Sequence, residues 1–299
     1  MTGTLAFTAL VLAALVAAIP ATALSQQQTP FNTSLLPTYY TLAAIAYHKD
    51  NVFTAWDCPL CKSPSVSDVI NAVYLPTQTP ERPEQGYIAV SPSLKTIIFS
   101  IDGTDDLDEW INNLKVWKRS WSNLHGCSSN VEVHSGFWNT WIELRGSMEP
   151  TLVSYLQAFP SYSVTFVGHS LGGAATLVAA VDLVNRRALS ANRAILVSFG
   201  QPRVGNIEFA QCVGAMGFKQ TARVVNKKDV VPVEYCDSHL PPIFLGYAHH
   251  SHEYWIDLYD VLVTNCNDDT GGEADNCSRT LDADLSVPDH VNYYNIALP

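Results

Sequence analysis

The sequence predicts an α/β protein whose central sheet is mostly parallel, on three observations. First, four short runs rich in β-branched and aromatic residues are apolar almost throughout, as strands buried on both faces are: 96–101 (TIIFSI), 164–168 (VTFVG), 194–200 (AILVSFG) and 222–226 (ARVVN). Second, residues 136–159 and 171–189 have helical periodicity and lie before and after such runs. Third, strands that alternate with helices imply parallel pairing through right-handed crossovers.

The composition limits the class of protein. Of 299 residues, 47% are hydrophobic and 15% are charged, which is typical of a globular chain with a large core. The net charge of −11 argues against a nucleic-acid partner, because phosphate binding needs clustered Lys and Arg. No repeat, low-complexity tract or long linker divides the chain, so we expect one domain after the amino-terminal segment.

The amino-terminal segment has the features of a secretory signal. Residues 5–19 are apolar and uncharged, but this stretch is shorter than the roughly 20 residues that span a membrane. Ala21-Thr22-Ala23 follows Pro20 and suits signal peptidase. We therefore expect residues 1–23 to be a signal peptide, and residues 24–299 to form a secreted domain with no transmembrane segment. The alternative is a buried amino-terminal helix.

The cysteines also fit an oxidising compartment. Two pairs frame short loops and are candidates for local disulfides: Cys58 with Cys61, and Cys266 with Cys277. Three more have no assigned partner, so at least one of the seven stays unpaired within the chain: Cys127, Cys212 and Cys236. No second CxxC or HxxxH accompanies the first CxxC, so we expect no metal site. Asn32 and Asn276 begin N-glycosylation sequons.

Gly168-His169-Ser170-Leu171-Gly172 fits the pattern G-x-S-x-G between a predicted strand and a predicted helix. In this context the serine sits on a sharp turn, where a Cβ at Gly168 or Gly172 would clash. Ser170 Oγ then points out at the carboxyl end of the strand, and the N–H of Leu171 can meet a developing oxyanion. The alternative is an ordinary glycine-rich turn.

A serine needs a base to take its proton and an acid to orient that base. Asp229 follows the strand at 222–226 and is the best candidate acid, although it could instead be a loop aspartate paired with a neighbouring lysine. His290 is the preferred base, because it lies late enough in the chain to be carried back by a loop. Three other downstream histidines remain alternatives: His249, His250 and His252.

Seven blocks of the chain resemble, in order, the fungal class 3 lipase family, which contains triacylglycerol lipases and related feruloyl esterases. They cover most of residues 90–295 and read TIIFSIDGTDDLDEWINNL, VEVHSGFWNTW, VTFVGHSLGGAAT, SFGQPRVGN, VVNKKDVVP, GYAHHSHEYW and DHVNYY. The resemblance implies an α/β-hydrolase fold with Ser170 as nucleophile, Asp229 as acid and His290 as base.

The resemblance also implies that Thr104 supplies the first oxyanion donor and Leu171 the second. The chain departs from the family pattern here, since Asp102 stands where the family usually has Arg. A negative charge at this place would oppose an oxyanion unless it points away or is paired.

Directly after Thr104, four apolar residues recur at helical spacing: Leu107, Trp110, Ile111 and Leu114. A surface helix packed on the core is the usual reading of such a stripe. The resemblance implies instead a short amphipathic lid that covers the site in water and opens at a lipid surface. The apolar stripe favours a lipase over a feruloyl esterase.

We therefore expect a secreted, monomeric serine hydrolase that needs no cofactor and cleaves carboxylic esters at an oil–water interface, with triacylglycerols as the preferred substrate. One alternative is a feruloyl or short-chain carboxylesterase. Another is a lipid-binding module without catalytic activity.

Overall fold

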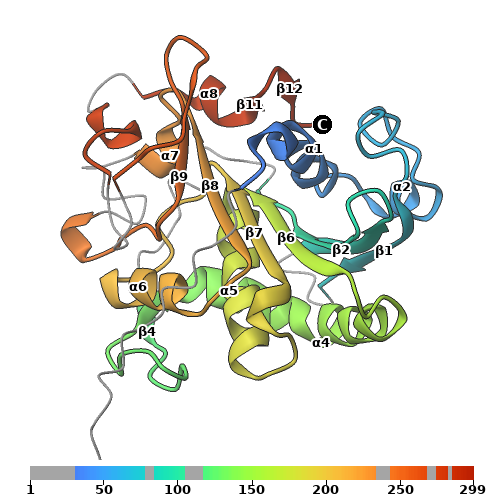
Figure 1. Ribbon diagram of the computed structural model, residues 1–299, viewed down its shortest axis with the longest axis horizontal. Coiled ribbons are helices and arrows are strands. Elements are labelled where there is room, and N and C mark those ends of the chain that lie inside the picture. Colours follow the sequence, from blue (N-terminus) through green and yellow to red (C-terminus); the bar gives the residue numbers. More distant parts are fainter. Residues whose placement is uncertain (1–30, 78–83, 105–116, 234–242, 268–273, 282–284) are drawn as a thin grey trace, which may run out of the picture.

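The computed structural model describes residues 31–77, 84–104, 117–233, 243–267, 274–281 and 285–299. In these ranges an eight-stranded sheet forms the centre of the molecule (Figure 1), with the strands in the spatial order β1 (Ile70–Pro76), β2 (Gln85–Ser91), β3 (Thr96–Ile101), β6 (Ser163–His169), β7 (Ala194–Phe199), β8 (Gln220–Asn226), β9 (Glu253–Ile256) and β10 (Leu262–Val263). The strands from β3 to β9 in this order pair in parallel, and the outer pairs are antiparallel. The predicted mostly parallel sheet is confirmed.

Two small antiparallel pairs lie outside this sheet: β4 (Lys118–Ser120) with β5 (Glu132–His134), and β11 (Asn292–Tyr293) with β12 (Ile296–Ala297). The helices are α1 (Leu36–Ile45), α2 (Asp50–Ala55), α4 (Ser135–Ala158), α5 (Leu171–Asn185), α6 (Ile207–Ala215), α7 (Val230–Val233) and α8 (Val287–Val291), with short 3₁₀ turns at Thr33–Leu35, Ala191–Arg193, Ile243–Leu245 and Ser278–Thr280. Among the described residues, no helix combines the length and apolarity that crossing a bilayer requires.

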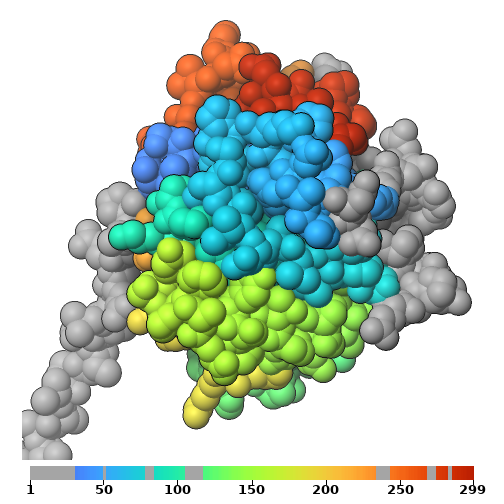
Figure 2. Space-filling view, turned by 90° about the vertical axis from the view of Figure 1, so that its right-hand side faces the viewer, coloured from blue at the N-terminus to red at the C-terminus, as the bar shows by residue number. Residues whose placement is uncertain are grey.

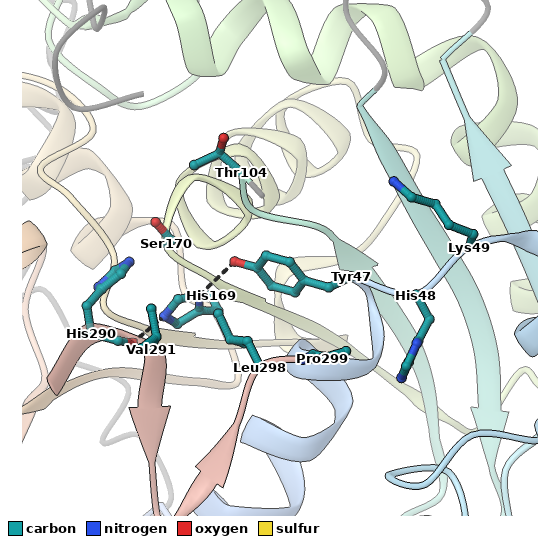
Figure 3. A pocket seen from close by; sticks show the side chains of 10 residues that line it. All are labelled: Tyr47, His48, Lys49, Thr104, His169, Ser170, His290, Val291, Leu298 and Pro299. Carbon is teal, nitrogen blue, oxygen red and sulfur yellow. Dashed lines mark hydrogen bonds between the residues drawn. The ribbon is translucent and has the colours of Figure 1, made fainter. Parts of the chain in front are cut away.

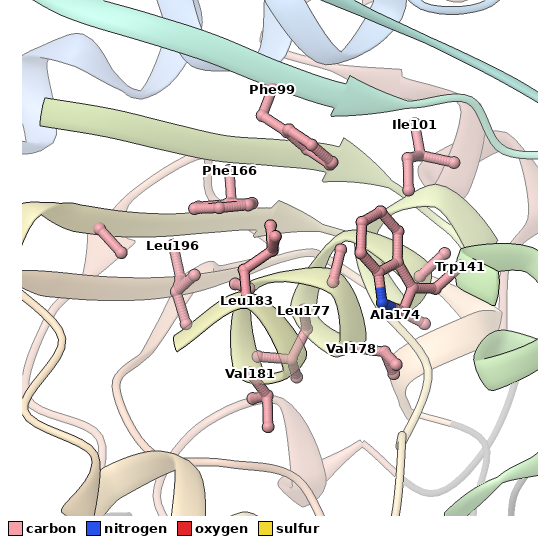
Figure 4. Close-up of a cluster of buried hydrophobic side chains, with 14 of the residues drawn as sticks. Phe99, Ile101, Trp141, Phe166, Ala174, Leu177, Val178, Val181, Leu183 and Leu196 are labelled. Atoms are coloured by element: carbon pink, nitrogen blue, oxygen red, sulfur yellow. The ribbon is translucent and has the colours of Figure 1, made fainter. Parts of the chain in front are cut away.

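The sheet is buried on both faces, which explains why its central strands are apolar almost throughout. Alternate side chains along a strand point to opposite faces, so Phe166 joins the cluster under α4 and α5, whereas Val167 joins the cluster under α1. Figure 4 shows the first cluster, in which Phe99 and Phe166 of neighbouring strands lie against the helices. The indole N–H of Trp141 in α4 donates to Asp182 in α5 at 2.9 Å and ties these two helices together.

The two ends of the described chain meet on the other face. Tyr40 of α1 stacks on Tyr293 of β11 with ring centroids 5.1 Å apart. Figure 2 shows the amino-terminal region, in blue and cyan, between the carboxyl-terminal segment in red and the α4 region in yellow-green. The amino-terminal helix therefore packs beside the late-chain segment that carries Tyr293.

Three disulfides are present in the described part of the chain: Cys58–Cys61, Cys127–Cys212 and Cys266–Cys277. Both predicted local bridges are therefore found, and the third joins two of the cysteines whose pairing was open. Cys236 lies outside the described residues, as do the predicted signal peptide and the predicted lid.

Candidate active site

Ser170 occupies a strained turn between β6 and α5. Its backbone has φ 57° and ψ −131°, and a positive φ is unfavourable for any residue with a side chain. The glycines around it are required for packing: a Cβ on Gly168 would lie 2.6 Å from the carbonyl of Gly172, and a Cβ on Gly172 would collide with the carbonyl oxygen of Ile101. The turn thus presents Ser170 at the carboxyl end of β6, as the sequence predicted.

Asp229 and His290 lie side by side although they are far apart in sequence. Asp229 follows β8, His290 lies in α8, and both side chains are buried. His290 Nδ1 lies 2.8 Å from Asp229 Oδ1. Because a carboxylate accepts, Nδ1 carries a proton, and in the neutral form of the ring Nε2 has the lone pair.

Asp229 has further donors that fix its carboxylate. Its Oδ1 also accepts from the backbone N–H of Val231 at 2.9 Å, and its Oδ2 accepts from the Tyr293 hydroxyl at 2.5 Å. Burial and the Asp229 charge raise the pKa of Tyr293 well above its ordinary value, so this hydroxyl stays protonated and donates. Tyr293 was not identified from sequence as part of the site; its position three residues after His290 was the available signal.

Ser170 and His290 face one cavity of about 480 Å³, shown in Figure 3. Within the described residues, neither Ser170 Oγ nor His290 Nε2 has a hydrogen-bond partner, although both atoms are buried. The cavity is lined by Tyr47, His48, Lys49, Thr104, His169, Ser170, His290, Val291, Leu298 and Pro299. A serine hydroxyl and an imidazole nitrogen are thus both available to a molecule that enters.

The three alternative histidines do not line this cavity. His249 Nε2 donates to the carbonyl of Pro232 at 3.0 Å, and the His252 ring bonds Thr221. Burial and the nearby Arg223 guanidinium lower the pKa of His250 to about 3. Of the four candidates, His290 is the one that lines the cavity with Ser170, and its ring bonds Asp229.

Thr104 lines the cavity together with Ser170, and Leu171 begins the helix that follows the serine. The segment that carries Thr104 packs directly on the turn, because a Cβ on Gly172 would also meet the carbonyl of Asp102 at 2.5 Å. Asp102 does not line the cavity: it is buried, and its Oδ1 accepts from the backbone N–H of Gln85 at 3.1 Å. Its carboxylate therefore points toward the neighbouring strand β2 and not into the cavity.

The four residues predicted for the lid lie outside the described residues, so their arrangement stays a prediction: Leu107, Trp110, Ile111 and Leu114. One cluster in the described chain has metal-ligand atoms close together, formed by Glu253, Cys266 and Cys277. The two sulfurs are joined in a disulfide, and Glu253 Oε2 pairs with Arg223 at 2.8 Å. Because the sulfurs and the carboxylate are engaged in these bonds, the cluster is not a ligand set for a metal.

The chain is similar to known lipases in sequence and in fold. Residues 98–237 match the family model described as lipase (class 3). The chain is 34% identical over 263 residues to a lipase of Rhizomucor miehei, covering 87% of this chain and 68% of that protein. It is also 34% identical over 174 residues to secreted mono- and diacylglycerol lipase 1 of Fusarium solani, covering 57% of this chain and 47% of that protein. The chain thus spans about two thirds of the length of the first relative and about half of the second.

A solved structure superimposes with a TM-score of 0.77 at 33% identity, covering 89% of this chain and 95% of that chain. That protein is described as a triacylglycerol lipase whose catalytic centre is a serine protease triad.

Proposed function

This chain belongs to the class 3 lipase family and has its α/β-hydrolase fold, and from that premise we propose that it hydrolyses triacylglycerols through an acyl-enzyme on Ser170. The observation that carries the proposal is the 2.8 Å contact between His290 Nδ1 and Asp229, which leaves Nε2 facing the cavity that holds Ser170. Among the described residues that line this cavity, no other set combines a nucleophile with a base that a carboxylate orients.

In this mechanism His290 Nε2 takes the proton of Ser170 Oγ as the oxygen attacks the ester carbonyl. Asp229 keeps the proton of His290 on Nδ1 and stabilises the imidazolium that forms. The oxyanion is bound by the backbone N–H groups of Leu171 and Thr104, and each such donor is worth roughly 10²–10³ in rate. His290 then protonates the departing alcohol and activates the water that releases the fatty acid.

The strained turn supports this role for Ser170. Strain of this kind costs on the order of 1–3 kcal/mol and persists where the surrounding packing requires it. Here the backbone is packed so closely at Gly168, at Gly172 and against Asp102 that the turn is held in this conformation. Asp102 opposes the oxyanion less than a carboxylate facing the cavity would, because its carboxylate accepts from the backbone N–H of Gln85 and does not line the cavity.

The nucleophile is tested with Ser170→Ala and a fluorophosphonate probe. We expect the variant to lose esterase activity by at least about 10³-fold, since removing a triad member leaves only the contribution of the oxyanion hole and binding. We expect the probe to label the wild type alone. A Ser170→Ala protein with full activity would refute the mechanism, and a wild type that the probe does not label would favour a lipid-binding module.

The substrate is tested by comparing emulsified long-chain triacylglycerol, a soluble short-chain p-nitrophenyl ester and methyl ferulate. Turnover of the emulsion supports the lipase, whereas a preference for methyl ferulate or the soluble ester supports the corresponding esterase.

The same assay tests the proposal that the segment after Thr104 is a lid. Trp110→Ala is expected to lower the rate on the emulsion while changing the rate on the soluble ester little, because an apolar side chain contributes only where there is a lipid surface.

We also propose that residues 24–299 form one secreted, monomeric domain after removal of residues 1–23. Three disulfides in the described chain and the naming of a relative as secreted support this proposal. Of the two sequons, Asn32 is the better acceptor, because the Asn276 amide nitrogen that would carry the glycan donates to the carbonyl of Asn265 and its neighbour Cys277 is in a disulfide. Amino-terminal sequencing and size-exclusion chromatography of the exported protein test these points.

A further inference from the structure

The residue before the nucleophile, His169, contacts the backbone of the residue that serves as base. His169 Nε2 lies 2.8 Å from the carbonyl oxygen of His290, and His169 Nδ1 lies 2.7 Å from the hydroxyl of Tyr47 (Figure 3). The two imidazole rings are tilted against each other with centroids 4.4 Å apart. His169 is almost completely buried and therefore keeps these contacts away from solvent.

The partners of His169 determine its proton positions. A carbonyl oxygen only accepts, so Nε2 must carry a proton and donate to His290. Burial and the neighbouring His290 lower the pKa of His169 well below its ordinary value, so the ring is neutral and Nδ1 has a lone pair. The Tyr47 hydroxyl is then the donor to Nδ1. The sequence of donors runs from Tyr47 through His169 to the backbone of His290.

We propose that His169 is a positioning residue that sets the place of His290 relative to Ser170, with Tyr47 fixing its orientation and tautomer. The inference rests on the proposed function. His169 and Ser170 are consecutive in the chain. A hydrogen bond from His169 to the His290 carbonyl therefore fixes the position of the base relative to the nucleophile. Asp229 fixes the imidazole of His290 at Nδ1, whereas His169 fixes its backbone.

Tyr47 also touches the segment that leads to Thr104. A Cβ on Gly103 would collide with the Tyr47 hydroxyl, and it would lie 3.0 Å from the carbonyl oxygen of His169. Gly103 thus leaves the space in which the hydroxyl reaches His169. One tyrosine from the end of the amino-terminal helical region therefore packs against both the candidate oxyanion segment and the turn that carries the nucleophile.

The surroundings of His169 keep this ring neutral beside the base. Besides His290 in α8, the rings that face it are Tyr40 of α1, Tyr47, and Tyr293 of β11. The pKa values of Tyr40 and Tyr293 are raised, chiefly by burial, so both are neutral. The only carboxylate in this group of contacts belongs to Asp229, which bonds His290 and Tyr293. A neutral His169 therefore places no positive charge against the imidazolium that forms on His290.

The test compares His169→Phe with His169→Gln on a soluble ester. Phenylalanine keeps the ring volume and removes both hydrogen bonds, and we expect kcat to fall on the order of 10²-fold with KM changed less than about threefold, because misplacement by about 1 Å can cost that much. Glutamine can place an amide N–H near the position of Nε2, so we expect it to recover at least about tenfold of the loss. The rate of fluorophosphonate labelling should follow kcat.

Tyr47→Phe is the milder variant, and it tests the proposal even if the His169 variants do not fold. We expect it to lower kcat roughly three- to tenfold, and to add little to the loss in His169→Phe, since both changes break the same chain of donors. Tyr87→Phe is the matched control, because it removes a buried tyrosine bond of 2.8 Å, to the carbonyl of Leu42, away from the cavity. We expect it to leave kcat unchanged.

The proposal is overturned by a folded His169→Phe with kcat within twofold of the wild type, by a glutamine variant no better than phenylalanine, or by additive losses in the double variant. These results are distinct from failure of the proposed function, which would appear as activity in Ser170→Ala.

Discussion

The Tyr293 hydroxyl holds the second oxygen of the carboxylate that orients His290. It donates to Asp229 Oδ2 at 2.5 Å and accepts from the backbone N–H of Asn226 at 3.1 Å. Asp229 and Asn226 are both buried, so no solvent molecule replaces this hydroxyl. A hydrogen bond to a charged group is worth about 1.5–3 kcal/mol, and its loss would let the Asp229 carboxylate turn away from His290 Nδ1.

We expect Tyr293→Phe to lower kcat/KM on a soluble ester roughly tenfold while the protein stays folded, because a missing bond of this strength is felt in the orientation of the base. The neighbouring Tyr294→Phe is the matched control, since the Tyr294 hydroxyl is buried and has no hydrogen-bond partner in the described chain. Steady-state kinetics of both variants check the prediction. Equal activity of the two variants would show that Tyr293 does not orient Asp229.

Sequence reasoning could identify Ser170, because its neighbours in the chain make the turn. It could not identify Tyr293 or Tyr47, because their roles depend on contacts between segments that are far apart in sequence. Tyr47 meets His169 from 122 positions away, and Tyr293 meets Asp229 across 64 positions. No local pattern distinguishes Tyr47 from a core aromatic residue, and for Tyr293 the one local signal is its position three residues after His290.

Among the elements, the turn between β6 and α5 depends most directly on its glycines. A Cβ on Gly172 would collide with backbone atoms of Ile101 and Asp102, which cannot move without displacing β3. We expect Gly172→Ala to lower the free energy of unfolding by at least about 3 kcal/mol or to prevent folding, because overpacking against backbone has no cheap relief.

Gly146 in α4 provides the opposite case. It is exposed, and nothing lies within 4 Å of its would-be Cβ. Gly146→Ala is expected to raise the free energy of unfolding by roughly 0.5–1 kcal/mol, since alanine loses less backbone entropy in a helix. Urea unfolding of both variants is the measurement. A Gly172→Ala protein as stable as Gly146→Ala would mean that the turn tolerates a side chain.

The elements differed in how well the sequence predicted them, and burial explains the difference. Strands β3, β6, β7 and β8 are covered on both faces, so each is an apolar run that stands out from its surroundings. Strand β1 lies at the edge of the sheet with mostly exposed or half-buried side chains and an irregular register near Asn71. Strand β2 is fully buried, but Gln85, Gly86 and Ser91 at its ends leave an apolar run of only four residues, 87–90.

At the scale of the whole molecule, the sequence predicted the mostly parallel sheet correctly but could not predict how the two ends of the chain come together. The stacking of Tyr40 on Tyr293 and the bond from Tyr47 to His169 join α1 to the late-chain segment that carries His290. The third disulfide, Cys127–Cys212, likewise joins residues 85 positions apart. Contacts of this range follow from the folded arrangement as a whole, and no single stretch of sequence specifies them.

The buried histidines make the stability of the whole molecule depend on pH. In the folded protein, burial and Arg223 lower the pKa of His250 to about 3, whereas an unfolded histidine has a pKa near 6.5. Below about pH 6.5 the unfolded chain therefore binds a proton at this position that the folded chain does not bind. The stabilisation is complete above the unfolded pKa and is lost as the pH falls toward about 3.

We expect His250→Asn to remove this dependence, because its amide can donate to the Ser251 carbonyl as His250 Nδ1 does at 3.0 Å but does not titrate. Between pH 7 and pH 5 the wild type should lose about 2 kcal/mol more of its free energy of unfolding than the variant does. His125→Asn is the control: it replaces an exposed histidine in place of a buried one, and this variant should follow the wild type. Urea titrations at both pH values decide the matter, and parallel losses in the wild type and His250→Asn would show that His250 is not held neutral in the fold.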